Sequence, residues 1–371
     1  MLEDYKYLIA LGLINGVGPV TTKLLVNTFG SAEAVFGLSQ HELSQIDGIS
    51  SSALRGLGTD KGWALERASR EMDFIDRHNV VPIAFNERNY PKRLLADESA
   101  PAMLFSLGQT DLNASKVLSI VGTRRPTQRG KDITTRIVTE LAERYPNLLI
   151  VSGLAYGIDV VSHRAALACG LPTVGVVAHG LNTIYPRQHR ETAAQMTRNG
   201  CVLTEYVSGV EPEAVNFVSR NRIVAAMADG TLVVESGASG GSLITASDAC
   251  EVGREVMAIP GSPMDEMSRG CNKIIRSGMA HLVESASDIE SVLGWEVPKN
   301  EPTQGSLFEN VEENDEERRI CEALLVDREL PAGVISTRTG LPMSQVSSLL
   351  LDMEFSGKVK SLPGNIYRLL K

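Results

Sequence analysis

Glycine turns that follow apolar runs carry the residue types in this sequence that are best suited to binding an anion. The apolar run 117–121 ends at Gly122, and Thr123, Arg124 and Arg125 follow it directly. Glycine lets the backbone come close to a ligand, and an arginine side chain binds a phosphate through two parallel hydrogen bonds. A strand that ends in glycine and leads into a helix therefore predicts a phosphate site, belonging either to a nucleotide cofactor or to a nucleic-acid backbone.

Similar polar blocks follow other apolar runs downstream. Ser152 and Gly153 precede a predicted helix, whose free N–H groups attract an anion. Phe217 lies close to Arg220 and Arg222, which is typical of a base that stacks on an aromatic ring with charge alongside. The alternative for Phe217 is an ordinary core aromatic at the start of a helix.

Two more loops extend the pattern. The run 231–235 leads into the serine- and glycine-rich loop 236–242, and the run 255–259 leads toward Lys273. Tight turns alone explain some of the glycines, but the arginines beside them favour an anionic ligand. No G-x-G-x-x-G follows the first strand and no G-x-x-x-x-G-K-[ST] occurs, so NAD and ATP are disfavoured and no cofactor is expected.

Catalytic and metal-binding patterns are weak. Asp159 and His163 lie four residues apart on one predicted helix face, and we interpret them as a local pair. Ser152 lacks the G-x-S-x-G setting of a hydrolase nucleophile. The five cysteines lie far apart without a CxxC or Cys/His cluster, which supports neither a zinc site nor a disulfide framework. We therefore interpret the chain as a binding protein rather than an enzyme.

Strand and helix patterns alternate through residues 80–295, and the elements that they predict hold these loops in position. Short apolar runs predict strands at 117–121, 148–151, 173–177, 201–205, 231–235 and 255–259. Helical patterns between them indicate an α/β fold, a doubly wound parallel sheet of Rossmann type. Ligands bind beyond the carboxyl ends of such strands, so the glycine turns are expected to meet at one edge.

Two smaller regions flank the predicted sheet domain of 69–295. Residues 1–68 predict short helices around two glycine turns, a helix-hairpin-helix or SAM-like domain that either holds a DNA phosphate or only packs. Residues 296–317 predict an acidic linker. Residues 318–371 predict three helices and a hairpin, a winged helix that either binds DNA or docks a partner.

The composition is that of an ordinary globular protein. The chain has 371 residues, 43% hydrophobic and 22% charged, with a net charge of −9. This charge argues against a uniformly basic nucleic-acid binder but leaves room for a local basic groove. No apolar run reaches the ~18 residues that span a bilayer, and the first residues are acidic where a signal peptide is basic, so a cytoplasmic location without a membrane partner is expected.

The ordered blocks VGTRRPT, VSGLAYGID, HGLNTIYP, FVSRNRIVAAMADGTLVVES, SGGSLITASDACEVGREVMAIPG and GCNKIIRSG resemble the DNA-processing protein A family, DprA or Smf. The resemblance covers roughly residues 80–295. It implies a non-enzymatic protein that binds single-stranded DNA during natural transformation, protects it and loads the RecA recombinase. It also implies a basic DNA pocket in an extended Rossmann domain and a homodimer formed through that domain.

The residue types and the resemblance together define a set of candidate DNA-binding residues. They are Gly122, Thr123, Arg124, Arg125, Ser152, Gly153, Leu154, Ala155, Asn216, Phe217, Arg220, Asn221, Arg222, Gly240, Gly241, Ser242, Thr245 and Lys273. The sequence departs from the family pattern at Val218, where the family often has proline. The family often has a lysine or arginine just upstream of Phe217 and in the loop 236–242. In this sequence those stretches contain, for example, Glu213 and Ser239 instead.

One rival function is a hydrolase of nucleotide monophosphates on a related sheet. Enzymes of that kind carry a P-G-G-x-G-T-x-x-E block, whose glutamate does the chemistry. The comparable stretch 239–248 of this chain lacks that glutamate.

Overall fold

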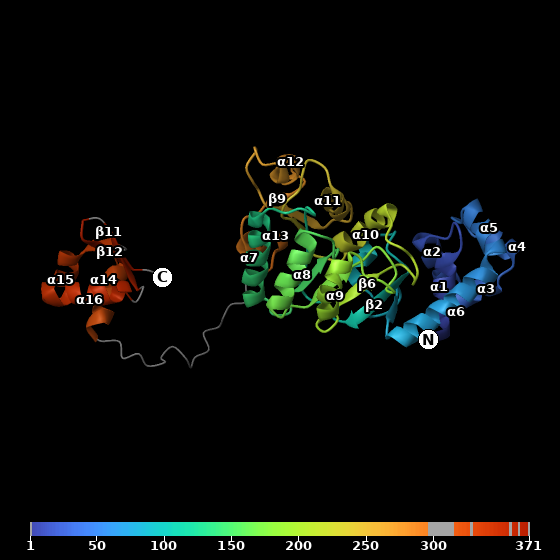
Figure 1. The fold of residues 1–371 in the computed structure, drawn as a ribbon, viewed down its shortest axis with the longest axis horizontal. Coiled ribbons are helices and arrows are strands. Elements are labelled where there is room, and N and C mark those ends of the chain that lie inside the picture. Colours follow the sequence, from blue (N-terminus) through green and yellow to red (C-terminus); the bar gives the residue numbers. More distant parts are fainter. Residues whose placement is uncertain (1, 296–314, 327–328, 356–357, 363, 370–371) are drawn as a thin grey trace. The chain divides into compact units, whose positions relative to one another are not determined.

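The computed structural model describes residues 2–295, 315–326, 329–355, 358–362 and 364–369 (Figure 1). The chain divides into two compact units, Met1–Pro298 and Lys299–Lys371. The first unit holds the N-terminal helices and the sheet, and the second holds the C-terminal helices and hairpin. Residues 296–314 of the predicted linker 296–317 lie outside the described residues. The last three residues of that range belong to a helix that begins at Asp315.

The N-terminal region is helical, as predicted. Its elements are α1 (Leu2–Leu13), α2 (Pro19–Phe29), α3 (Ala32–Gly37), α4 (Gln40–Ser44), α5 (Ser51–Thr59) and α6 (Lys61–His78). A domain boundary at residue 68 would fall inside α6. Side chains start several of these helices, because Ser31, Ser39 and Ser50 each accept a hydrogen bond from a backbone N–H three residues on.

The sheet contains short strands joined mostly by helices. The strands are β1 (Val81–Ala84), β2 (Met103–Gln109), β3 (Val117–Val121), β4 (Leu149–Ser152), β5 (Thr173–Val176), β6 (Gly200–Thr204), β7 (Gly230–Val233), β8 (Glu255–Ala258) and β9 (His281–Leu282). The helices are α7 (Gln128–Arg144), α8 (Ile158–Ala168), α9 (Arg190–Met196), α10 (Ala214–Ala226), α11 (Gly241–Glu251), α12 (Arg269–Arg276) and α13 (Ala286–Leu293). Short 3₁₀ turns are η1 (Lys92–Ala96), η2 (Arg187–His189) and η3 (Glu266–Ser268).

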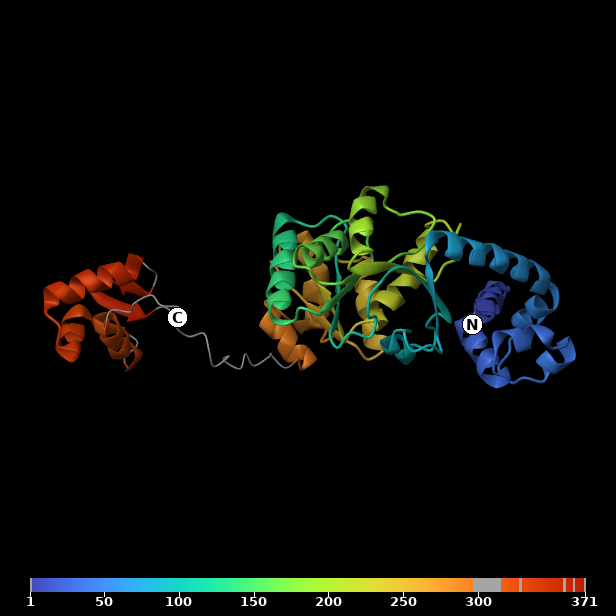
Figure 2. The same ribbon diagram turned by 90° about the horizontal axis from the view of Figure 1, so that it is seen from below.

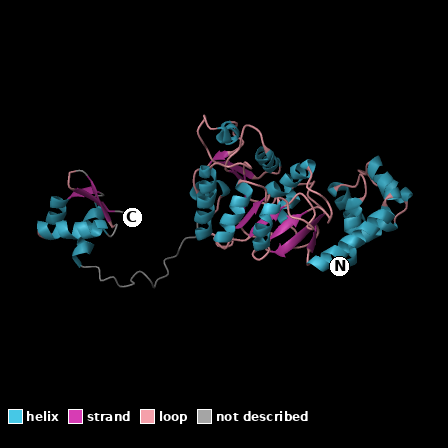
Figure 3. Ribbon diagram, in the orientation of Figure 1, coloured by secondary structure: helices cyan, strands magenta, loops and turns pink. Residues whose placement is uncertain are grey.

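Helices cover both faces of the sheet, which is why its strands read as continuous apolar runs (Figures 2 and 3). All five residues of β3 are buried. Val117 and Val121 belong to one apolar cluster, whereas Leu118 and Ile120 belong to another. Alternate side chains of this strand therefore fill two separate core layers.

The six predicted strands are all present, within one or two residues of their expected ends. The described strands pair in the order β1-β2-β6-β5-β4-β3-β7-β8-β9. In this order, the seven strands β6, β5, β4, β3, β7, β8 and β9 are parallel to one another. Strands β1 and β2 add an antiparallel edge that the sequence analysis did not predict. From β3 the chain builds outward through β4 to β6 and then returns to place β7 on the other side, so the topological switch point lies between β3 and β7.

The first glycine turn of the N-terminal region packs against the sheet domain. Val17 is buried in the apolar cluster that also contains Met103 and Phe105 of β2. Next to it, the Lys23 ammonium group donates a hydrogen bond to the carbonyl of Glu98 at 2.7 Å. Of the two alternatives for this turn, the contacts favour packing over the binding of a DNA phosphate.

The second unit has the predicted order of helices and hairpin. Its elements are α14 (Asp315–Val326), β10 (Glu329–Pro331), α15 (Ala332–Thr339), α16 (Met343–Phe355), β11 (Val359–Leu362) and β12 (Ile366–Leu369). The three strands pair antiparallel in the order β10-β12-β11. Ile320, Ile335 and Val346 join the three helices in one buried cluster. No helix within the described ranges is long and apolar enough to cross a membrane.

Gly157 is a point where the carboxyl edge of the sheet tolerates no side chain. Its φ is +84°, and a Cβ placed there would lie 2.1 Å from the carbonyl oxygen of Thr123. Gly170 has a similar φ of +72° but open space around it. We expect Gly157→Ala to lower the free energy of unfolding by about 3 kcal/mol or more, and Gly170→Ala by only about 1 kcal/mol. Urea unfolding of both variants measures the difference, and equal losses would contradict the clash.

Candidate nucleic-acid interface

The loops after β3 and β7 meet at the switch point and enclose a pocket of about 530 Å³. The Thr123 N–H donates to the Glu235 carbonyl at 2.7 Å, which joins the two loops. We call this cavity the switch-point pocket. The predicted site residues that line it are Gly122, Thr123, Arg124, Gly153, Ala155, Phe217, Arg220, Asn221, Gly240, Gly241, Ser242 and Thr245. Residues far apart in the sequence thus meet at the edge where the strand pattern places them.

Arg220 lines the pocket, and only 4% of its surface is exposed. Its Nη1 atom donates to the carbonyl of Gly153 at 2.6 Å and to the carbonyl of Val176. Its Nε atom is buried and has no hydrogen-bond partner among the described residues. Burial lowers the pKa of this guanidinium, and the nearby carboxylate of Asp159 opposes that shift. Arg220 therefore brings one buried positive charge to the pocket.

Asp159 is a buried acid in the same wall that the sequence analysis did not assign to the site. Its Oδ2 atom accepts hydrogen bonds from the N–H groups of Gly153, at 3.2 Å, and Ala155, at 3.4 Å. Burial raises the pKa of Asp159, and Arg220 opposes the rise. The amides before α8 that were expected to attract an anion are thus already bound to a carboxylate of the chain itself.

The local pair predicted between Asp159 and His163 is wrong. His163 is fully buried and its Nδ1 atom lies 2.7 Å from the Thr173 hydroxyl, so the ring faces β5 rather than Asp159. Burial lowers the pKa of this histidine to about 3, which keeps the ring neutral. The two residues share a helix face as expected, but Asp159 binds the backbone just before α8, whereas His163 binds Thr173 of β5.

The start of α11 provides free backbone donors in the pocket. No side chain caps this helix, whose first residue is Gly241. A Cβ at Gly241 would have open space, with its nearest neighbour, the Asn221 Nδ2 atom, 3.8 Å away. At Gly122, by contrast, a Cβ would lie 2.6 Å from Ile158. Gly122 is therefore required by packing, whereas Gly241 leaves room for a ligand close to a helix N-terminus.

Phe217 is partly exposed and lines the pocket instead of packing in the core. The exposed Arg124 guanidinium lies 5.5 Å from the centre of this ring, and that of Arg220 lies 5.9 Å from it. An aromatic face with flanking cations is the arrangement on which a nucleobase stacks. Of the two alternatives for Phe217, the geometry favours the stacking surface.

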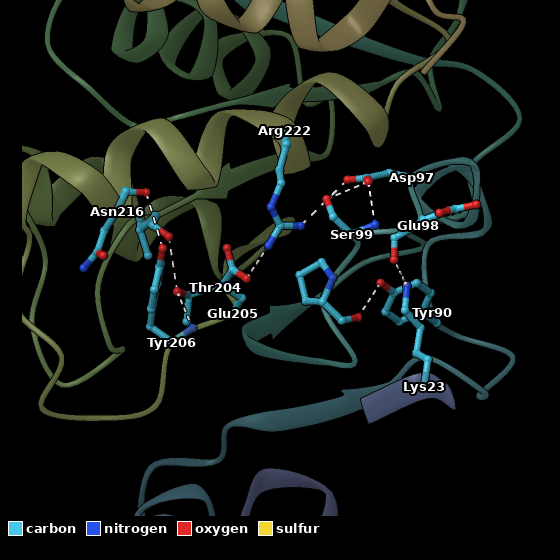
Figure 4. Close-up of polar contacts among 12 residues, drawn as sticks. Lys23, Tyr90, Asp97, Glu98, Ser99, Thr204, Glu205, Tyr206, Asn216 and Arg222 are labelled. Atoms are coloured by element: carbon cyan, nitrogen blue, oxygen red, sulfur yellow. Dashed lines mark hydrogen bonds and ion pairs between the residues drawn. The ribbon is translucent and has the colours of Figure 1, made fainter. Parts of the chain in front are cut away.

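Arg222 does not reach the switch-point pocket, although it was predicted to hold a phosphate. It is bound to Glu205 at 2.5 Å, and its Nη1 atom lies 3.8 Å from Asp97 (Figure 4). Burial raises the pKa of Glu205, and Arg222 opposes the rise. The charge of Arg222 is therefore neutralised beside the N-terminal domain, where Figure 4 also shows Lys23 bound to Glu98.

The other predicted residues outside the pocket have different positions. Ser152 is buried and donates to the carbonyl of Ile120, and Leu154 is fully buried. The Asn216 amide donates to the carbonyl of Glu211, and Arg125 is exposed beyond the pocket lining.

Lys273 lines a second hollow of about 580 Å³ with Arg269 and Arg276, on one face of α12. Ala238 lines this hollow, whereas its neighbours Gly237 and Ser239 line the switch-point pocket. The loop between β7 and α11 thus separates the two concave surfaces.

Comparisons with known proteins identify the family of this chain. The family described as DNA recombination-mediator protein A matches residues 82–294, and the DprA winged helix domain matches residues 306–365. Protein Smf of Escherichia coli is 34% identical over 79% of this chain and 78% of its own length. This chain belongs to the DNA recombination-mediator protein A family.

Two solved structures of DNA processing protein A resemble the fold. The protein from Streptococcus pneumoniae has a TM-score of 0.62 and 33% identity, covering 78% of this chain and 96% of its own. The protein from Helicobacter pylori, described with a single-stranded DNA binding mode, has a TM-score of 0.52 and 27% identity, covering 58% and 95%. The resemblance to the DprA family and the C-terminal winged helix are thereby confirmed.

Two of the departures from the family pattern fall in the pocket itself. Val218 lines it with 51% of its surface exposed, and Ser239 lines it in the loop where the family often has a lysine or arginine. Of the described residues that line the pocket, Arg124 and Arg220 carry the positive charges. The aliphatic residue Ile244 had no signal in the sequence, because exposed and buried aliphatic positions cannot be told apart there.

The position of Arg222 predicts a structural role. Replacing Arg222 with glutamine leaves Glu205, whose side chain is 14% exposed, without its ionic partner, so we expect a loss of about 3 kcal/mol in the free energy of unfolding. Arg77→Gln is the matched control, because its ion pair with Asp73 is exposed and contributes less than about 1 kcal/mol. Urea unfolding followed by circular dichroism compares the two. Unchanged stability together with weaker DNA binding would restore Arg222 as a phosphate ligand.

Proposed function

We propose that this chain binds single-stranded DNA in the switch-point pocket and acts as a recombination mediator. The observation that carries the proposal is the meeting of the uncapped start of α11, two arginines and the Phe217 ring in one pocket. Amides and arginines suit phosphates, and an accessible ring suits an unpaired base. The single-stranded DNA binding described for the Helicobacter pylori relative supports the same assignment.

The distribution of charge supports a local nucleic-acid site in an acidic chain. The net charge is −9, yet the exposed Arg124 lies at the pocket and Arg269, Lys273 and Arg276 lie exposed on α12 nearby. Acidic residues instead surround Arg222, on the side of the N-terminal domain. These exposed cations near the pocket attract a negatively charged strand to this part of the molecule.

A binding role fits the pocket better than the rival hydrolase. The carboxylate in its wall, Asp159, accepts two backbone hydrogen bonds and lies beside Arg220, so its environment is that of a structural anion. The stretch 239–248 lacks the glutamate that the rival chemistry needs. Release of free base from AMP by the purified protein would favour the hydrolase.

The finer parts of the role rest on the family resemblance. We propose that the bound strand is incoming DNA, that the protein protects it and loads RecA on it, and that it works in the cytoplasm as a homodimer formed through the sheet domain. The winged helix either contacts DNA or docks a partner, and both alternatives stay open. Gel shifts with single- and double-stranded oligonucleotides, with and without RecA, test these steps in turn.

Arg124 provides the sharpest test of the pocket. We expect Arg124→Ala to weaken single-strand binding by about 1–3 kcal/mol, because a charged hydrogen bond to phosphate is lost. The slope of log affinity against log salt should also become shallower by about one unit. Fluorescence anisotropy at several salt concentrations measures both quantities.

Arg198→Ala is the matched control for this experiment. Arg198 is exposed just before β6, at the opposite, amino-terminal edge of the sheet. Its removal changes the net charge equally, and we expect unchanged affinity. If the two variants bind alike at every salt concentration, the switch-point pocket is not the DNA site.

A further inference from the structure

Exposed apolar side chains gather around a pocket whose other features suit phosphates. Val218 is 51% exposed and Ile244 is 40% exposed, and both line the switch-point pocket. Tyr185, which is 45% exposed, lies against Phe217 at the same place. A site that bound only the backbone of a nucleic acid would have no use for apolar groups in water, so their clustering here favours a ligand with an apolar part.

Tyr185 extends the aromatic surface that Phe217 begins. The two ring centres are 5.9 Å apart and the ring planes are inclined by 56°. Arg124 covers part of the Phe217 ring from within the pocket. Because the two rings are tilted, they cannot both stack on one flat base, and each ring presents its own face.

The backbone around Tyr185 is held in place by a buried histidine. The Tyr185 N–H donates to the Nε2 atom of His179 at 3.2 Å, and the Nδ1 atom of His179 lies 2.9 Å from the Gly180 carbonyl. His179 is fully buried. Tyr185 is therefore exposed on a supported loop after β5, which lowers the entropy lost when a ligand stacks on it.

The adjacent phosphate-binding features identify the ligand. A protein partner would fit the apolar surface but not the uncapped helix start and the two arginines, Arg124 and Arg220, that line the pocket. A duplex would offer its phosphates but keep its bases stacked inside. A single strand offers phosphates and unpaired bases together, and only it satisfies both halves of the site.

We infer that Tyr185 and Phe217 form a two-base platform on which consecutive bases of a single strand are splayed apart, and that Tyr185 makes the site select single strands over duplex. This inference rests on the proposed function, because it assumes that the phosphates lie in the switch-point pocket. Phosphates supply sequence-independent attraction, and the platform supplies the discrimination between strand types.

The test compares three probes of equal length: a thymidine oligonucleotide, the same backbone with abasic sites, and a duplex. The full chain, Tyr185→Ala and Tyr185→Phe are measured by fluorescence anisotropy. We expect Tyr185→Ala to bind the thymidine strand roughly 5- to 150-fold more weakly and the abasic strand and duplex unchanged. Tyr185→Phe, which keeps the ring, should bind all three like the unmodified chain.

Trp63→Ala is the matched control, because Trp63 is an exposed aromatic residue on α6, 55% exposed against 45% for Tyr185. The inference is overturned if Tyr185→Ala loses affinity equally for the thymidine and abasic strands, or loses none. It is also overturned if the unmodified chain binds those two strands equally. Failure of the unmodified chain to bind any single strand would instead overturn the proposed function itself.

Discussion

The buried guanidinium of Arg220 is the interaction on which the carboxyl edge of the sheet depends. It joins α10 to the carbonyls of Gly153, after β4, and Val176, in β5. It also lies beside Asp159, which in turn binds the amides of Gly153 and Ala155. A buried charge of this kind is tolerated only with such partners, so the loops that supply them are held in fixed positions.

This arrangement explains features that otherwise look like ligand contacts. A Cβ at Gly153 would lie 2.1 Å from the Nη1 atom of Arg220, so glycine is needed there for packing. Gly122 is likewise required by Ile158. What Arg220 offers a ligand is a positive potential under the Phe217 ring, beside the uncapped glycine start of α11.

Two arginines that lie two residues apart on α10 have different environments. Arg220 lies under the pocket, whereas Arg222 is bound to Glu205 and lies close to Asp97. The acidic partners come from the loop after β6 and from the segment before β2, and the N-terminal domain packs beside them through Lys23. The same helix thus contributes to ligand binding on one side and to the joint with the N-terminal domain on the other.

The sequence by itself determined the parallel sheet, the order of its strands along the chain and the edge at which the glycine loops meet. These follow from short-range patterns, since a strand buried on both faces must be apolar and its ligand loops must follow its carboxyl end. The antiparallel β1 and β2 were missed because β1 contains a proline and neither strand belongs to the repeated strand–helix pattern. Only the tertiary structure decided which arginines are held in ion pairs: among the described residues Arg124 forms none, while Arg222 pairs with Glu205 and lies close to Asp97. Such neutralisation depends on residues distant along the chain, and no local pattern encodes their approach.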